Sequence, residues 1–375
     1  MVAMAALPGP VLVVGTGLLG TSMGLALREH GVEVLLRDTS PAAAHLARDM
    51  GAGRLAGLAA GEPAPVAHPV LVVVATPPDV VVPTVLAALE EYPAAVVTDV
   101  ASVKGSVEAA VLAAAGTEGP RYVGSHPMAG REKSGAAAAD ADLFHGRTWV
   151  ICTRDDVVRG GVAMVRALAT TVGAVPLAMP AEEHDVAVAV VSHLPQIMAS
   201  LAAARLDAVP GDALSLAGQG LRDTTRIAAS DPMLWAKILS ANATAVLPHA
   251  SAVRDQMSEL VEALERAARD GVGSEGVMGT FARAIHRGRD GVSRIPGKHG
   301  GAARRYAEVT VLVPDKPGQL GRLFGEVGEA GVNIEDFRME HSAGAKLGVA
   351  TLSVVPARQV ELTEHLENQG WRVMQ

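Results

Sequence analysis

The sequence is poor in aromatic residues and contains a single cysteine. Only 3% of the 375 residues are Phe, Trp or Tyr although 49% are apolar, so Ala, Val and Leu must build the core. The one cysteine, Cys152, cannot form an intrachain disulfide, which indicates a reducing, cytoplasmic location. A chain of this length can hold two or three domains, each able to bury a core.

An excess of basic charge is also missing. The formal net charge of −8 argues against a mainly electrostatic nucleic-acid binder. We find no apolar run of the ~18–20 residues that span a bilayer, and the apolar N-terminus lacks the basic region of a signal peptide. No His/Cys cluster has metal-ligand spacing. We therefore expect no nucleic-acid partner, no membrane partner and no metal site.

The pattern of apolar residues changes along the chain and predicts three domains and a linker. Residues 1–180 alternate Ala-rich helical segments with continuous apolar runs, which is typical of an α/β fold with a parallel sheet covered on both faces. Residues 181–285 lack strand alternation and are expected to be all-helical. Residues 286–304, rich in Gly and basic residues, are expected to form a linker, and residues 305–375 follow the order βαββαβ. The runs predicted as strands of the first domain are 10–15, 32–38, 69–76, 94–100, 121–126 and 148–153.

A Gly-rich turn follows the first predicted strand and opens a helix, the context in which a GxGxxG motif binds a dinucleotide. Its glycines permit close approach of backbone N–H groups to a pyrophosphate, although a purely structural turn is the alternative. The residues of the turn are Gly15, Thr16, Gly17, Leu18, Leu19 and Gly20.

Two other polar positions bear on the cofactor. Asp38 ends the second strand, where an acid meets the ribose hydroxyls, and its charge favours NAD over NADP. Against this, Arg37, Thr39 and Ser40 could hold a 2′-phosphate. Thr76 follows the third strand and is expected either to line the cofactor cleft or to cap a helix.

Two short polar segments, TDVASVKG (98–105) and GSHPMAGREKSG (124–135), offer groups for chemistry beside that cofactor. Ser102 could exchange a proton or simply cap a helix, and Lys104 could hold an anion or cap the turn. His126 follows a predicted strand and suits a general base, because imidazole titrates near neutral pH. Glu132 and Lys133 are expected to form a rim of the site or a solvated charge pair.

The helical region carries a second polar set. Ser192 and Gln196 are four residues apart and share a helix face, and Pro195 should kink or break that helix. Arg222 and Arg226 are also four apart, which suits a dianionic ligand as well as a solvated stripe.

Four further residues of the helical region have predicted places. Asp231 is expected to cap a helix whose first turn carries Trp235. His184 and His193 are nine apart and should lie on opposite faces unless the kink intervenes. We expect His184 near the site and His193 to be structural.

The order of these motifs, continued by VVSHLPQ (190–196) and DTTRIAASDPMLW (223–235), resembles the prephenate/arogenate dehydrogenases of tyrosine biosynthesis over residues 10 to about 285. The resemblance implies a Rossmann-like NAD-binding domain and a helical domain that forms a homodimer, with the active site between them. His126 corresponds to the catalytic histidine that accepts the ring hydroxyl proton, Ser102 to its hydrogen-bonding serine, and Arg226 to the arginine that binds the ring carboxylate. The implied lining of the substrate pocket is Glu132, Ser192, Trp235 and His184.

One position departs from the pattern of the family. Many members carry histidine where this chain has Gln196, next to the side chain of the substrate. A neutral amide lacks the charge that would attract the ammonium of arogenate, so we expect prephenate, with arogenate or 4-amino-4-deoxyprephenate as alternatives. Arg222 is an additional candidate for binding the substrate.

The C-terminal module resembles an ACT domain, a ferredoxin-like fold that binds amino acids. The segments LVPDKPGQLG (312–321) and GVNIEDF (331–337) carry the resemblance and imply that Asp315, Gly318 and Asn333 contact an effector, expected to be tyrosine. An ACT domain kept only for assembly is one alternative. Another is a catalytically silent amino-acid sensor, against which the intact His126, Ser102 and Arg226 argue.

Overall fold

The computed structural model describes residues 7–56, 68–130, 135–271, 273–296, 306–341 and 347–374. The chain divides into two compact units, Met1–Ser200 with Ile227–Ser251, and Leu201–Arg226 with Ala252–Gln375. The helices predicted as one domain over 181–285 are therefore shared between both units.

An eight-stranded sheet forms the centre of the first unit, in the order β3-β2-β1-β4-β5-β6-β7-β8. The first six strands of this order pair in parallel, as their continuous Val/Leu runs predict, because both faces must be covered. The carboxyl ends of β4, β5 and β6 therefore meet at one edge. The strands are β1 (Val11–Val14), β2 (Val34–Arg37), β3 (Arg54–Leu55), β4 (Leu71–Val74), β5 (Val96–Asp99), β6 (Tyr122–Pro127), β7 (Thr148–Cys152) and β8 (Val175–Met179).

The sheet is mixed, so the prediction of a wholly parallel sheet is wrong at one end. Strand β7 runs antiparallel to β6, and β8 is parallel to β7. The described part of the β6–β7 connection holds only the short 3-10 turns η3 (Ala136–Ala138) and η4 (Ala141–Phe144), and a parallel strand needs a longer crossover. Strands β3 and β8 were not predicted from the sequence. The first is two residues long, and the second contains Pro176, which an edge strand tolerates.

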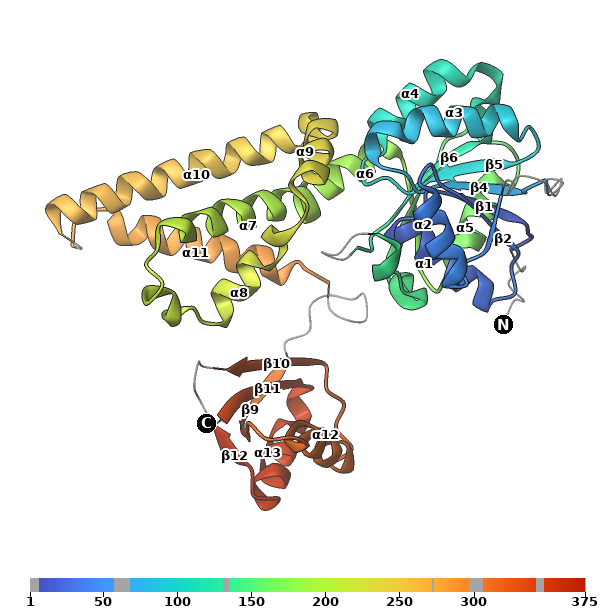
Figure 1. The fold of residues 1–375 in the computed structure, drawn as a ribbon. Helices are drawn as coiled ribbons and strands as arrows, with labels where there is room; N and C mark the ends of the chain where they lie inside the picture. The colour runs from blue at the N-terminus through green and yellow to red at the C-terminus, as the bar shows by residue number, and fades with distance from the viewer. Residues whose placement is uncertain are drawn as a thin grey trace. The chain divides into compact units, whose positions relative to one another are not determined.

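Helices cover both faces of the sheet (Figure 1). On one face α1 (Leu18–Glu29), α2 (Pro41–Asp49) and α5 (Gly161–Thr171) bury a cluster that includes Met23, Ala47 and Leu168. On the other, α3 (Val81–Glu91) and α4 (Gly105–Ala115) bury Val85 and Val111. The 3-10 turns η1 (Pro78–Val80) and η2 (Gly116–Arg121) flank this second face.

The first unit continues with α6 (Ala181–Val188), a π-helical turn η5 (Ala189–His193), α7 (Leu194–Ala204) and α9 (Pro232–Ala241). The π-turn lies directly before Pro195, which lacks an N–H and whose ring clashes with the carbonyl four residues earlier. The predicted interruption of this helix is confirmed. Asp231 Oδ1 accepts a hydrogen bond from Leu234 N at 2.7 Å, which confirms the predicted cap of α9.

By length and composition, the stretch Ala181–Ala208 could cross a membrane. Our expectation of no such run is therefore wrong, because residues 186–204 hold no charged side chain. Its polar members His184, Asp185, His193 and Gln196 are nevertheless buried. Val186, Val190 and Val191 are exposed, so the stretch is covered on one side only.

The second unit holds η6 (Arg205–Ala208), η7 (Ala213–Leu216), α8 (Gln219–Thr225) and most of α10 (Ala243–Asp270), while η8 (Arg226–Ala229) begins at its boundary. Helix α11 spans Val277–Ser293, so the prediction of a linker from residue 286 is wrong for its first eight residues. Met278, Ile285 and Val292 recur every seven residues along this helix, and all three are exposed.

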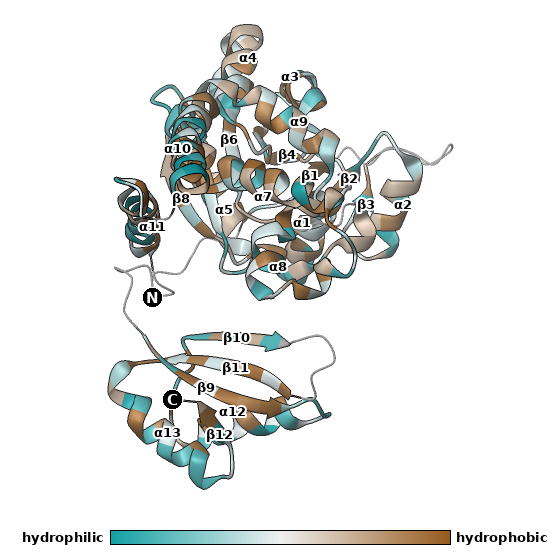
Figure 2. Ribbon diagram, turned by 90° about the vertical axis from the view of Figure 1, so that its left-hand side faces the viewer, coloured by the Kyte–Doolittle hydropathy of each residue, from teal (hydrophilic) through white to brown (hydrophobic). Residues whose placement is uncertain are grey.

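The C-terminal module has the predicted βαββαβ order and an antiparallel sheet in the order β10-β11-β9-β12, the ferredoxin-like arrangement. Figure 2 shows how apolar β9 and β11 are. Gly318 is the residue before α12 and has a φ of +85°, which favours glycine, and Asn333 Nδ2 donates to Glu335 Oε1 at 2.8 Å. Asp315 and Asn333 are exposed. The elements are β9 (Ala307–Pro314), α12 (Gln319–Glu329), β10 (Asp336–His341), β11 (Leu347–Val354), η9 (Pro356–Arg358), α13 (Gln359–Asn368) and β12 (Arg372–Met374).

Candidate active site

The Gly-rich turn joins β1 to α1 in a conformation that needs its glycines. Gly15 has a φ of +100°, and a Cβ there would lie 2.5 Å from the carbonyl oxygen of Ala75. A Cβ on Gly20 would lie 1.9 Å from the carbonyl oxygen of Gly15. By contrast, a Cβ on Gly17 would meet nothing within 4 Å, so space is open at the N-terminus of α1. This open end, with its free N–H groups, fits a pyrophosphate.

Asp38 braces this turn. Its Oδ2 accepts hydrogen bonds from Thr16 N at 2.6 Å and Thr16 Oγ1 at 2.9 Å, and its Oδ1 accepts from Ser40 N at 2.8 Å. A carboxylate has about four lone-pair positions, so it can still accept a bond from a ribose hydroxyl. The carboxylate therefore orders the turn and keeps a negative charge at the end of β2.

The groups that could have favoured a 2′-phosphate are largely engaged elsewhere. Arg37 donates to both carboxylate oxygens of Glu91, at 2.7 and 2.9 Å, and to Tyr92 Oη at 2.6 Å. The hydroxyl of Ser40 caps α2 by accepting from Ala43 N at 3.3 Å. Both arrangements favour the unphosphorylated cofactor.

Thr76 follows β4 at the same edge of the sheet. Its hydroxyl is buried and has no hydrogen-bond partner among the described residues. The helices η1 and α3 that follow it have no side-chain cap, so the capping alternative is excluded. An unpaired buried hydroxyl is costly, and a polar group of a ligand would satisfy it.

A buried ion pair holds the strand ends beside the predicted base. Lys104 and Asp99 are both fully buried and paired, and Asp99 Oδ2 also accepts from Tyr122 Oη at 2.7 Å. Lys104 Nζ donates to the carbonyl of Ser125 at 2.9 Å, one residue before His126. Lys104 is therefore a structural cation: it holds an anion, as one prediction had it, but that anion is Asp99 of the protein itself, and its side chain does not cap the turn.

His126 lies near the carboxyl end of β6 and contacts His184 of α6. His126 Nδ1 and His184 Nε2 are 2.9 Å apart, with ring planes at 76°. His184 Nδ1 is in turn 2.8 Å from Asp185 Oδ1. The prediction that His184 lies near the site is thus supported by direct contact with the predicted base.

The surroundings keep the His126 ring neutral. Burial, and then the charges of His184, Lys104 and His193, lower the pKa of His126 well below 6.5. At neutral pH the imidazole therefore carries a free lone pair and can accept a proton.

Ser102 lies in the bend between β5 and α4 and is half-buried. No hydrogen bond joins it to His126 within the described chain. It does not cap α4 either, because the side chain of Asp185 accepts from Lys104 N and Gly105 N, each at 2.8 Å. Ser102 lines a small, mainly apolar cavity of about 130 Å³ with residues of η1, α3, α4 and α9, among them Pro78, Val82 and Ile238.

The π-turn and α9 complete the described surroundings. His193 is buried and its ring meets Trp235 edge-on at 5.9 Å. Asn242 links His193 Nδ1, at 3.1 Å, with the backbone carbonyl of Asp185, at 2.9 Å. Burial lowers the pKa of His193, and the charge of Asp185 partly opposes this. His184 and His193 are both buried, although they are nine residues apart, because the wider π-turn lies between them. This is the exception that the sequence allowed for if a kink intervened.

The other candidates of the helical region differ in their placement. Gln196 is buried, and its Nε2 donates to Ile227 O at 3.0 Å, so this donor is directed at the backbone next to Arg226. Ser192 is half-buried in the π-turn. Arg222 and Arg226 are exposed and belong to the second unit, and their contact with a substrate stays a prediction. Glu132 and Lys133 lie outside the described residues.

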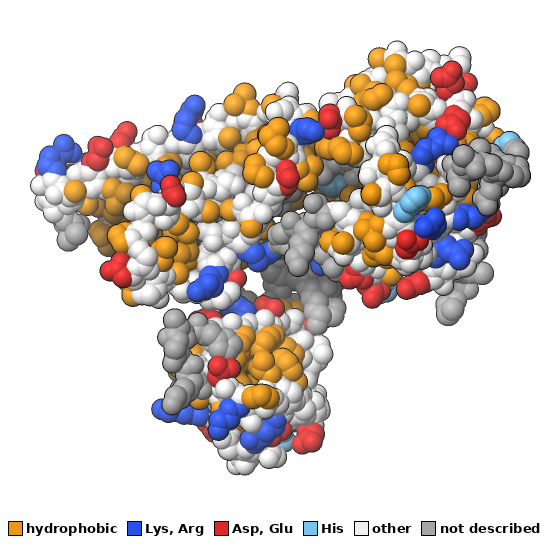
Figure 3. Space-filling view, viewed as in Figure 1, with side chains coloured by type: hydrophobic (Ala, Val, Ile, Leu, Met, Phe, Trp, Pro, Cys, Tyr) orange, Lys and Arg blue, Asp and Glu red, His pale blue; other side chains and the backbone are white. Residues whose placement is uncertain are grey.

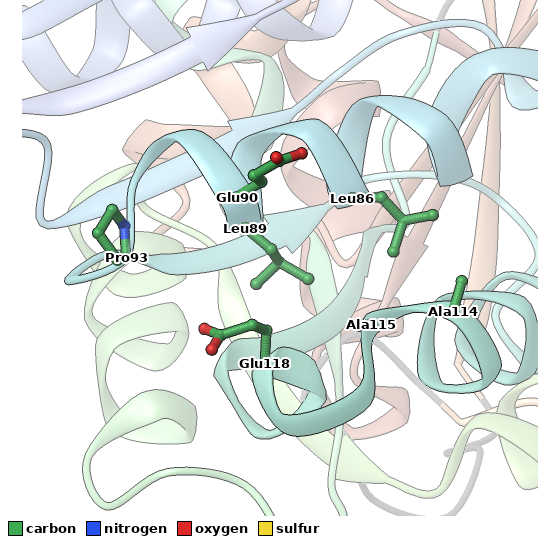
Figure 4. A pocket seen from close by; sticks show the side chains of 7 residues that line it. All are labelled: Leu86, Leu89, Glu90, Pro93, Ala114, Ala115 and Glu118. Atoms are coloured by element: carbon green, nitrogen blue, oxygen red, sulfur yellow. The ribbon is translucent and has the colours of Figure 1, made fainter.

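A larger hollow of about 390 Å³ lies between α3 and the segment after α4 (Figure 4). It adjoins the amino ends of β5 and β6, whereas ligands of open α/β sheets bind at the carboxyl ends. Its polar side chains are Glu90 and Glu118, and Glu118 is paired with Arg121. We therefore take the surroundings of His126 as the candidate active site.

Reasoning from the sequence missed Asp185, Asn242 and the role of Asp99. Asp185 had a signal, because it is the last acidic or basic residue before a stretch of 19 residues, 186–204, that holds no Asp, Glu, Lys or Arg. Asp99 had one as well, since a carboxylate that ends a buried strand needs a partner. Asn242 had none.

Known proteins resemble this chain in sequence and in fold. Residues 23–177 match the family model of the prephenate dehydrogenase nucleotide-binding domain, and residues 180–275 match that of the prephenate dehydrogenase dimerization domain. NovF of Streptomyces niveus, a probable prephenate dehydrogenase, is 35% identical over 96% of this chain and 98% of its own length. The crystal structure of prephenate dehydrogenase from A. aeolicus with hydroxyphenyl propionate and NAD+ has a TM-score of 0.62 and 27% identity, and covers 75% of this chain and 97% of that one. The chain belongs to the prephenate dehydrogenase family.

Proposed function

We propose that this protein is an NAD-dependent dehydrogenase that converts prephenate to 4-hydroxyphenylpyruvate and CO₂. The observation that carries the proposal is the neutral, buried His126, which lies at the edge of the sheet that also holds the Gly-rich turn and Thr76. The family supplies the substrate and the cofactor, and this geometry supplies the base.

The reaction needs few groups from the protein. The ring C–H of the alcohol carbon is lost as hydride, and His126 Nε2 accepts the hydroxyl proton. The C–O bond becomes a carbonyl, the ring carboxylate leaves as CO₂, and its electron pair makes the ring aromatic. The proton then returns to the phenol oxygen. Ser102 would orient the hydroxyl, and Arg226 would bind the ring carboxylate in a bidentate fork.

NAD supplies the hydride acceptor in this proposal. The Gly-rich turn would hold its pyrophosphate, Asp38 its ribose hydroxyls, and Thr76 Oγ1 a polar group farther into the cleft. The engagement of Arg37 by Glu91 and Tyr92 supports NAD over NADP.

The side chain of the substrate meets a neutral environment at Gln196, whose amide nitrogen is engaged by Ile227 O. An assay of the purified protein with prephenate, arogenate and 4-amino-4-deoxyprephenate, each with NAD and with NADP, tests the proposal. We expect NADH formation and CO₂ release with prephenate and NAD. Absence of turnover with every ring substrate would exclude a dehydrogenase and favour the amino-acid sensor.

We also propose that the C-terminal module is an ACT domain that binds tyrosine and inhibits the enzyme. The βαββαβ order, and Gly318 at the N-terminus of α12, support a site for an amino-acid carboxylate. Deleting residues 305–375 should abolish inhibition by tyrosine without abolishing turnover. Unchanged inhibition in the truncated protein would contradict this role and favour assembly alone.

A homodimer is the proposed assembly. The family model that matches residues 180–275 is a dimerization domain, and α10 exposes Met257, Val261 and Leu264 at helical spacing. Figure 3 shows apolar side chains gathered on the surface of the helical region. A second copy of the chain would cover them.

A further inference from the structure

We infer that His184 and Asp185 are positioning residues that fix the tautomer of His126 and balance the charge it gains. This inference rests on the proposed function, in which His126 is the base. It assigns a role to Asp185, and it gives His184 a task other than lining the substrate pocket.

The three side chains form a hydrogen-bonded chain from α6 to β6. Asp185 Oδ1 lies 2.8 Å from His184 Nδ1, and His184 Nε2 lies 2.9 Å from His126 Nδ1. His184 is fully buried, and Asp185 and His126 are less than a tenth exposed. The chain is therefore shielded from water, which would otherwise compete for these bonds.

The carboxylate sets the direction of every bond in this chain. An ionised carboxylate only accepts, so His184 Nδ1 must carry a proton. In neutral His184 the other nitrogen, Nε2, is then an acceptor, so His126 Nδ1 must donate to it. Neutral His126 is consequently protonated on Nδ1 and has its lone pair on Nε2, the nitrogen that our mechanism uses.

Asp185 is itself held rigidly as an anion. Desolvation raises the pKa of its carboxyl group, but hydrogen bonds from His184, Lys104 N and Gly105 N outweigh this and lower the pKa below its usual value. The last two donors are backbone N–H groups at the N-terminus of α4, where the helix dipole favours a negative charge.

The same carboxylate offsets the groups around the base that disfavour its protonation. His184 of α6, His193 of the π-turn and Lys104 before α4 all disfavour a protonated His126. When Nε2 accepts the substrate proton, the imidazolium must coexist with these groups. Asp185 lies two hydrogen bonds away. Among the three hydrogen-bonded side chains it is the one with a negative charge, and this charge favours the imidazolium.

Nitrogen NMR of the protein labelled on histidine tests the tautomer directly and needs no substrate. The spectrum of His126→Asn assigns the His126 signals by their loss. We expect the Nδ1–H tautomer in the native protein, a mixture or the Nε2–H tautomer in His184→Leu, and recovery in His184→Gln, whose amide oxygen can accept from Nδ1–H. His193→Gln is the matched control, because His193 bonds Asn242 and not His126.

Kinetics supply the second readout. His184→Leu should lower kcat by roughly 10²-fold, within the range a positioned base contributes, while the KM for prephenate changes little. His184→Gln should regain most of that loss, and Asp185→Asn should shift the acid limb of the pH–rate profile. If His184 were merely structural, both replacements would lower thermal stability. The loss of kcat would then not depend on whether the new side chain can accept a hydrogen bond from His126 Nδ1.

The two proposals can fail separately. An unchanged His126 tautomer in His184→Leu, together with kcat within twofold of native, would overturn the positioning role even if prephenate is the substrate. If His184→Leu alters the tautomer of His126 but the native protein turns over no ring substrate, the positioning role of His184 and Asp185 is upheld and the proposed reaction is rejected.

Discussion

At the scale of single residues, the environment of His126 predicts the pH dependence of the reaction. Only the neutral ring accepts a proton, and its pKa lies well below 6.5 because of burial and, after it, the neighbouring His184, Lys104 and His193. As the pH falls through 6.5, kcat/KM should therefore stay level and decline only at lower pH. Measuring kcat/KM with prephenate between about pH 4.5 and pH 8 checks this. An acid limb centred at 6.5 or higher would show that His126 is not so perturbed.

Replacing the base gives a complementary prediction. His126→Asn keeps a polar side chain but cannot accept the proton, so kcat should fall by roughly 10²–10⁴-fold and the acid limb should vanish. The affinity for NAD, measured by calorimetry, should change little. Turnover near the native rate would assign the base to another residue.

The glycines of the cofactor turn make a matched pair. Gly20→Ala forces a methyl group to 1.9 Å from the carbonyl oxygen of Gly15 and should destabilise the fold by roughly 1–3 kcal/mol or more. Gly17→Ala meets no atom within 4 Å at a φ of −74°, so the protein should fold normally. Its methyl group would instead occupy space for the pyrophosphate and raise the KM for NAD about tenfold, equivalent to about 1.4 kcal/mol. Thermal melts and NAD titrations separate the two effects, and equal destabilisation by both changes would contradict this reading of the turn.

Sequence reasoning finds residues whose chemistry is local and misses those defined by distant partners. His126 and Ser102 stand out because polar groups follow apolar strands. Asp185 stands out only as the last charged residue before 186–204, and its role does not follow from that, because its carboxylate accepts from Lys104 N, 81 residues away.

At the scale of elements, the loop from β5 to α4 depends on its buried ion pair. Lys104→Met would leave Asp99 buried without its cation, which should cost roughly 3–5 kcal/mol of unfolding free energy. Lys237→Met removes an ion pair with Asp79 whose side chains are 39% and 53% exposed, and should change stability little. Urea titrations of both variants compare them, and similar midpoints would show that the buried pair contributes no more than the surface one.

Element prediction from the sequence succeeds where burial alone decides. Continuous apolar runs mark β1, β2, β4 and β5 because both faces of the sheet are covered. The direction of β7 escapes prediction, because it depends on a connection that lacks a regular crossover helix among its described residues. The linker prediction failed at α11 because we gave the glycines and basic residues from residue 286 onward more weight than the apolar residues at heptad spacing in the same segment.

At the scale of the whole molecule, the exposed stripe on α10 predicts how two copies associate. Val261→Lys places a charge in that stripe and should shift the protein toward monomer in sedimentation velocity. Leu46→Lys, on α2 of the nucleotide-binding sheet and similarly exposed at 43%, is the control and should stay dimeric. A dimer that survives Val261→Lys would place the interface on another face.

The π-turn over Ala189–His193 also bears on how this protein can change during evolution. A π-turn holds one residue more than an α-helical turn, so deleting a single residue within it would restore a regular helix and leave the phase of α7 nearly unchanged. Gln196 would then stay on the buried side, whereas a deletion within the regular part of α7 would rotate every later position by about 100°. Among active relatives, deletions of one residue should therefore be more frequent in the π-turn than within α7.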